Sequence, residues 1–172
     1  MRRLFLSTLV ALACKSADGE QASVGRVEVR WGDSTRQAQL SAPAEARWCA
    51  RDSMLEVMAF RNDSGIGFAL YARDSLRAEG YPLFQAPIFA PWRPQATAAL
   101  RLLTPTELRG YESTWGQVVV TDAGPGGVSG TLDLHFKLMT GTDSLHVTGS
   151  FSGVRILPAA ASCGRANKPS RG

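Results

Sequence analysis

The chain has 172 residues, of which 44% are hydrophobic and 20% charged, so it can form one globular domain with a proper core. Its formal net charge is only +4, and Arg2 and Arg3 supply half of that charge. The remaining arginines are scattered, whereas a nucleic-acid-binding protein carries a basic stripe, so no nucleic-acid partner is expected.

The N-terminus has the pattern of a secretory signal peptide over residues 1–13. Arg2 and Arg3 give a basic start, an apolar run follows, and small residues precede Cys14. The run is too short to cross a bilayer, which takes about 20 apolar residues. A buried N-terminal helix is the alternative, but it gives the arginines and the small residues no role. We therefore expect an exported protein.

The motif Ala11-Leu12-Ala13-Cys14 resembles the lipobox of bacterial lipoproteins, in which the cysteine receives diacylglycerol. Position 11 carries Ala where the family most often has Leu, and an ordinary signal peptidase would cut at the same bond. The polar residues of 14–24 suit a flexible tether. The resemblance implies a membrane-anchored lipoprotein of the cell envelope, modified at Cys14. Lys15 implies the outer membrane, facing the periplasm or the cell surface.

Three cysteines are an odd number for an exported chain. If Cys14 carries lipid, Cys49 and Cys163 remain, and an oxidising compartment would let them form a disulfide. Two separate thiols are the alternative. Neither cysteine has a second Cys or His at ligand spacing, so no metal site is expected there.

Alternation of apolar and polar residues recurs along the chain and predicts an all-β domain over 25–163. Turn signals at roughly ten-residue spacing indicate about 8 to 10 strands, in an antiparallel β-sandwich or a small β-barrel. The sandwich is preferred because the proline-rich stretch 81–92 would interrupt closure of a barrel. The stretch 53–60 is apolar on both phases except Glu56, as expected of a strand covered on both faces. Residues 164–172 are predicted to be a disordered tail.

The clearest unit is a hairpin near the C-terminus. A two-residue turn at Gly141-Thr142 puts all apolar residues on one face, with pairs Leu132–Phe151, Leu134–Gly149, Phe136–Val147 and Leu138–Leu145. On the polar face this register pairs Lys137 with His146 and makes His135 a diagonal neighbour of His146. The stretch 111–154 also resembles the C-terminal part of uncharacterised bacterial envelope lipoproteins, which implies a fold more than an activity.

His135 and His146 are the only histidines, and aspartates lie close by, so a metal site or a proton relay is conceivable. A solvated polar face with ordinary cross-strand pairs is the preferred interpretation, because Lys137 opposite His146 would repel a cation. No G-x-S-x-G nucleophile elbow is present. We therefore expect no metal, no cofactor and no enzyme activity. A small envelope hydrolase or metalloenzyme is the alternative.

Aromatic residues on the proline-rich stretch are the candidates for a binding surface. Trp92 and Arg93 lie between prolines, and Tyr81 and Phe89 are near them in sequence. Such aromatics anchor partners at small entropic cost, although they also serve as lids over a sheet edge. The expected function is a non-catalytic binding or structural module whose partner is an envelope protein or a glycan. A carrier with a hollow barrel for hydrophobic ligands is a further alternative.

Overall fold

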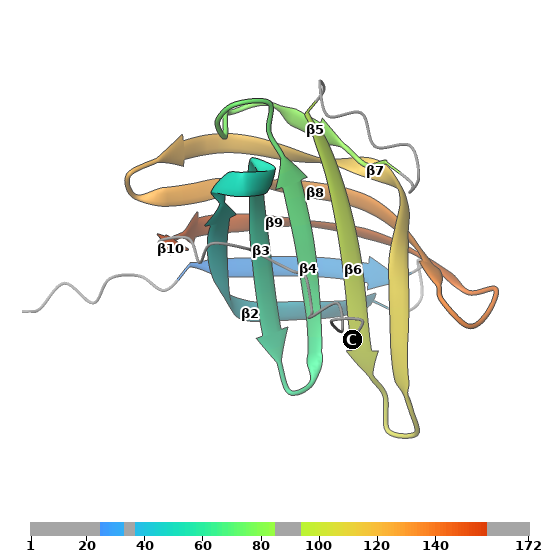
Figure 1. The fold of residues 1–172 in the computed structure, drawn as a ribbon. Coiled ribbons are helices and arrows are strands. Elements are labelled where there is room, and N and C mark those ends of the chain that lie inside the picture. Colours follow the sequence, from blue (N-terminus) through green and yellow to red (C-terminus); the bar gives the residue numbers. More distant parts are fainter. Residues whose placement is uncertain (1–24, 33–36, 85–93, 158–172) are drawn as a thin grey trace, which may run out of the picture.

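The computed structural model describes residues 25–32, 37–84 and 94–157, and these form a single all-β unit (Figure 1). The strands are β1 (Arg26–Gly32), β2 (Gln37–Cys49), β3 (Met54–Arg61), β4 (Ser64–Tyr71), β5 (Gly80–Pro82), β6 (Gln95–Leu103), β7 (Leu108–Gly124), β8 (Gly127–Leu138), β9 (Ser144–Val154) and β10 (Ile156–Leu157), with a 3-10 turn η1 (Ala50–Asp52) after β2. The predicted signal peptide, tether and tail lie outside the described residues.

Eight of these strands close into an antiparallel barrel. Neighbours follow the order β1-β9-β8-β7-β6-β4-β3-β2, and β1 also pairs with β2, which joins the two ends of the sheet. The short β5 pairs with β7, and β10 runs parallel to β2. The all-β class is thus confirmed, and the small barrel named as the alternative is the architecture found.

The sandwich that we preferred is not the arrangement of this chain, and β4 and β6 show why. These two strands pair directly with each other, from Gly65 opposite Arg101 to Tyr71 opposite Gln95. Of the proline-rich stretch, Tyr81 and Pro82 lie in β5, which pairs with β7 and is not one of the eight strands of the ring. Pro82 therefore removes no hydrogen bond between the strands that close the barrel.

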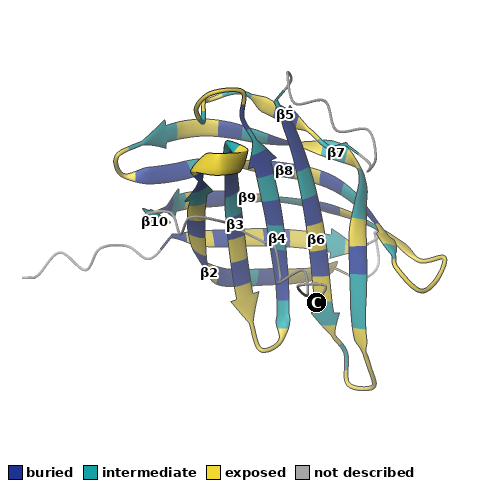
Figure 2. Cartoon of the chain, in the orientation of Figure 1, coloured by how far each residue is buried: buried dark blue, intermediate teal, exposed yellow. Residues whose placement is uncertain are grey.

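Along most of the long strands, alternate residues point into the barrel and are buried, whereas β7 buries only Tyr111, Val118 and Val120 (Figure 2). Phe68 on β4 and Phe151 on β9 belong to strands that are not neighbours, yet their ring centroids are 5.2 Å apart. The two rings therefore meet across the interior. An eight-stranded barrel is just wide enough for side chains to fill it, and this level of the interior is filled in that way.

The loop between β8 and β9 corrects the predicted hairpin register. The amide of Leu138 donates to the carbonyl of Asp143 at 2.8 Å, so the loop has four residues, 139–142, instead of two. Every partner on β9 shifts by two positions, which leaves each side chain on its predicted face because the strand period is two. His135 now lies directly opposite His146, and Lys137 lies opposite Ser144.

The outer face of β3 also differs from its prediction. Met58 and Phe60 point outward and are 40% and 45% exposed. No described segment covers them, although the double apolar pattern of 53–60 predicted a strand covered on both faces. The pattern instead marks an apolar surface on the outside of the barrel.

Candidate functional sites

The structure does not support the predicted aromatic surface at Tyr81, the one predicted member that lies among the described residues. Tyr81 is 0% exposed, because β5 places it opposite Val118 in the core. Its hydroxyl accepts a hydrogen bond from the Arg77 amide at 3.1 Å, and burial raises the pKa of Tyr81. Tyr81 is therefore a core residue and not part of a binding surface. Phe89, Trp92 and Arg93 lie outside the described residues.

Cys49, the last residue of β2, is buried against Met54. Its predicted partner Cys163 and the predicted lipidation site Cys14 both lie outside the described residues. The disulfide and the lipid anchor therefore stay predictions.

A cluster of histidine, aspartate and tryptophan side chains lies on the outer face of β7, β8 and β9. Asp133 and His135 are two residues apart on β8, and His146 faces His135 from β9. Nε2 of His146 is 2.7 Å from Oδ1 of Asp133. The two imidazole rings stack with centroids 4.2 Å apart and planes 10° apart. The cluster thus combines three potential ligand atoms within 4.8 Å of one another.

An irregularity in β7 brings Trp115 into this cluster. The register between β7 and β8 shifts between Ser113 and Trp115, which turns Trp115 onto the outer face. Its ring stacks on His135 with centroids 3.5 Å apart, and Trp115 is still 61% exposed. Gly116 follows with a φ of 121°, and a Cβ there would lie 2.1 Å from the carbonyl oxygen of Asp133. Glycine is therefore required at this position.

The stacked arrangement affects the charge of His135. Burial lowers its pKa, the neighbouring His146 lowers it further, and Asp133 acts in the opposite direction. Because the charged form is disfavoured, His135 is mainly neutral at neutral pH. Neutral imidazole is the form that binds metal ions and accepts protons.

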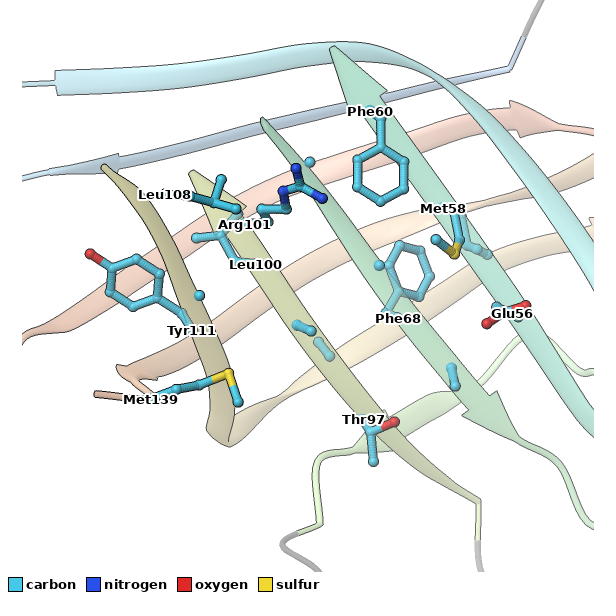
Figure 3. Close-up of a pocket in the computed structure, with 17 residues that line it drawn as sticks. Glu56, Met58, Phe60, Phe68, Thr97, Leu100, Arg101, Leu108, Tyr111 and Met139 are labelled. Atoms are coloured by element: carbon cyan, nitrogen blue, oxygen red, sulfur yellow. The ribbon is translucent and has the colours of Figure 1, made fainter. Parts of the chain in front are cut away.

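The second candidate site is an apolar groove on another part of the outer surface, over β3, β4, β6 and the start of β7. Outward side chains on β4 and β6 are mostly small, with Gly65 opposite Arg101, Gly67 opposite Ala99 and Ala69 opposite Thr97. Larger side chains flank this floor: Met58 and Phe60 on β3, and Leu108 and Met139 on the other side (Figure 3). The groove between these walls has a volume of about 550 Å³.

Glycines determine the shape of the groove. A Cβ at Gly65 would lie 2.1 Å from the Phe60 ring, so that ring lies directly over Gly65. Met139 covers Gly110 in a similar way, since a Cβ there would lie 3.3 Å from its sulfur. Gly67 is different, because a Cβ there would have a backbone oxygen at 3.7 Å as its nearest neighbour. The floor at Gly67 is therefore open.

Comparisons with known proteins do not extend this description. No family model matches the chain, no curated protein matches it, and no solved structure matches it. Among the described residues, no helix has the length and apolar character needed to span a membrane. The two candidate sites therefore rest on their own geometry.

Proposed function

We propose that this chain is an exported, lipid-anchored protein of the bacterial envelope whose barrel binds a partner protein through the apolar groove, without catalysis. Support for export and anchoring comes from the signal-peptide pattern of 1–13 and from the lipobox-like motif ending at Cys14. The observation that carries the binding role is the pair Met58 and Phe60, which are large, apolar and exposed beside an open floor. Contiguous exposed apolar surface of this kind marks interaction sites.

The interior of the barrel is a weaker candidate for binding. A carrier for hydrophobic ligands needs a hollow barrel, whereas Phe68 and Phe151 contact each other across the middle of this one. The groove offers apolar surface that is already accessible. We therefore place the partner on the outside of the barrel.

The dimensions of the groove suit one amphipathic helix of the partner. Its walls stand on β3 and β7, three interstrand spacings apart, which is about 14 Å. A helix with its side chains is about 10 to 12 Å wide. The small floor residues Gly67 and Ala99 let a helix approach closely. Met58 and Met139 have flexible side chains that adapt to the apolar face of a helix.

Charges at the two ends of the groove are consistent with a helix and give it a direction. Glu56 lines one end and Arg101 lines the other, four residues further along the strands (Figure 3). The N-terminus of a helix carries partial positive charge and its C-terminus partial negative charge. The bound helix would therefore place its N-terminus at Glu56 and about nine residues in contact.

Site-directed photo-cross-linking in native membranes tests this proposal. A photo-reactive benzophenone residue is placed at position 99 in the groove, or as a control at position 131 on the outer face of β8. We expect an adduct only from position 99, and its cross-linked peptide should show apolar residues at i, i+3, i+4 and i+7. An adduct with a second copy of this chain or with lipid would contradict the proposal, and so would the absence of any adduct.

A groove-filling variant provides the matched control. Gly67→Leu fills the floor at the position where a Cβ has room, so the barrel should still fold. It should lower the adduct yield about tenfold, which corresponds to about 1.4 kcal/mol. Thr131→Leu adds the same kind of side chain outside the groove and should leave the yield unchanged. Equal yields from the two variants would show that the groove is not the contact.

Anchoring and the disulfide are tested by the intact mass of the protein extracted from native membranes. We expect residues 14–172 plus acyl chains, with the mass rising by two hydrogens when a Cys49–Cys163 bridge is reduced. An unmodified mass in the soluble fraction would contradict the anchor. A mass that does not change on reduction would contradict the bridge.

A further inference from the structure

We propose that Asp133, His135 and His146 form a binding site for a divalent transition-metal ion, most favourably Zn²⁺, on the outer face of β8 and β9. This site is separate from the apolar groove and from the proposed partner. It uses one carboxylate oxygen and two imidazole nitrogens. Zn²⁺ binds these donors in proteins, usually with four ligands, so a water molecule would complete the coordination.

The strand geometry places the three ligands on one face. Asp133 and His135 are at positions i and i+2 of β8, so their side chains point the same way. His146 lies directly opposite His135 on the neighbouring strand. Directly opposed residues have Cβ atoms about 5 Å apart, which is close enough for both side chains to reach one ion. All three ligand atoms already lie within 4.8 Å of one another.

The contact between His146 and Asp133 needs only a small change to hold an ion. Their Nε2 and Oδ1 atoms are 2.7 Å apart. Two ligands about 2.1 Å from a tetrahedral ion are about 3.4 Å apart, so this hydrogen bond would open by less than 1 Å. Both side chains are at least half exposed. The His146 ring must also turn out of its parallel stack on His135, because the in-plane lone pairs of two parallel rings do not meet at one ion.

Contacts on one face of its ring orient His135, and they leave the ring edge, where the nitrogen lone pair lies, for an ion. Trp115 stacks on one face of its ring, and the backbone carbonyl of His135 accepts a hydrogen bond from Oγ1 of Thr114 at 3.1 Å. The stacking contact restricts the orientation of the ring, and the hydrogen bond holds the backbone of β8 at this position. Such supporting contacts orient metal ligands and raise affinity. The irregularity in β7 therefore has a structural role, because it places Trp115 against the His135 ring.

The observed register places less positive charge beside the cluster than the register predicted from sequence. Lys137 lies on the same face, but it faces Ser144 on one side and Glu112 on the other. Its charge is therefore not directly opposite His146 and is partly offset by Glu112. The proposal predicts that Lys137→Gln raises metal affinity.

Calorimetric titration with ZnCl₂ tests the site. The probe protein is the full chain without a polyhistidine tag, first treated with a chelator and then with a thiol-blocking reagent so that cysteines do not compete. We expect one ion per chain, and His146→Gln or Asp133→Asn should each weaken binding by at least about 10- to 100-fold, the loss that removal of an outer-shell partner alone causes. Asp143→Asn, a carboxylate on the adjoining loop, should leave affinity unchanged. No saturable binding would overturn the proposal, and so would equal affinity in His146→Gln.

Histidine NMR keeps the proposal testable even if a variant fails to fold. In the unsubstituted protein, Zn²⁺ should shift the ring resonances of both histidines together and saturate at one equivalent. Shifts of only one histidine, or of neither, would overturn the three-ligand site.

Discussion

Two parts of the same outer surface differ sharply, although both belong to one barrel wall. Over β3, β4 and β6 the outward residues between Glu56 and Arg101 are mostly small or apolar, and Met58 is exposed beside Gly67. Over β7, β8 and β9 the outward residues are mostly polar, and Asp133 and His146 are hydrogen-bonded. The inward residues are buried and apolar behind both parts. The comparison shows that the interior determines the fold, while the outer face is free to carry different sites.

The largest expected effect comes from a change to the shared interior. Phe68→Ala removes a ring that is 3% exposed and contacts Phe151 across the barrel. We expect the free energy of unfolding to fall by about 3 to 5 kcal/mol, since the cavity cannot collapse fully. Urea unfolding followed by circular dichroism measures this change.

Met58→Ala is the matched control on the apolar outer face. Met58 is exposed, so its truncation should change the free energy of unfolding by about 0.5 kcal/mol or less. A large loss would mean that residues outside the described part of the chain cover the groove. The pair of variants therefore distinguishes an open groove from a covered one.

A smaller effect is expected at the irregularity that builds the polar face. Gly116→Ala places a Cβ 2.1 Å from the Asp133 carbonyl and forces an unfavourable φ. We expect a loss of about 1 to 3 kcal/mol and weaker stacking of Trp115 on His135, measured by unfolding and by near-UV circular dichroism. Gly126→Ala, in a turn with open space around it, is the control and should change neither quantity. Unchanged stacking in Gly116→Ala would mean that the irregularity does not depend on Gly116.

Alternation was sufficient to predict the all-β class and the inward residues, because it is a local property. Val27, Leu134 and Val147 occupy the apolar phase of their strands and are all buried. Closure was not predictable in this way. It depends on pairing between β1 and β9, which are far apart in sequence and carry no local signal of contact. The length of the loop between β8 and β9 was also ambiguous in sequence. The predicted partners on β9 are therefore wrong by two positions, although each side chain lies on its predicted face.

The candidate sites were less predictable than the fold. The apolar outer phase of β3 is visible in sequence, but an apolar pattern on both phases is typical of strands buried on both faces and therefore predicts a covered strand. Trp115 could not be placed beside His135, because a bulge reverses the alternation at that point. Gly116 is the one local hint, since glycine inside a strand often marks a bulge. Tyr81 was assigned to the surface from its neighbours and lies in the core.

The smallest expected effect is a pH dependence of stability that arises from His135 on the polar face. In the presence of a chelator, His135 should titrate below the ordinary value of 6.5, because burial and His146 both lower its pKa. The unfolded chain keeps the ordinary pKa, so below about 6.5 the unfolded state binds more protons than the folded state. Stability should therefore fall as the pH decreases through 6.5 and level off below the folded pKa. NMR titration of the ring protons gives the folded value.

Trp115→Ala distinguishes the two causes of the lowered pKa of His135, which are burial and the charge of His146. Removing the stacked ring exposes His135 to water, so its pKa should rise toward 6.5, while Met58→Ala in the groove should leave it unchanged. If the pKa stays low without Trp115, the charge of His146 is the main cause, and His146→Gln should then raise it. A pKa that responds to neither variant would mean that the stacked arrangement does not exist in solution.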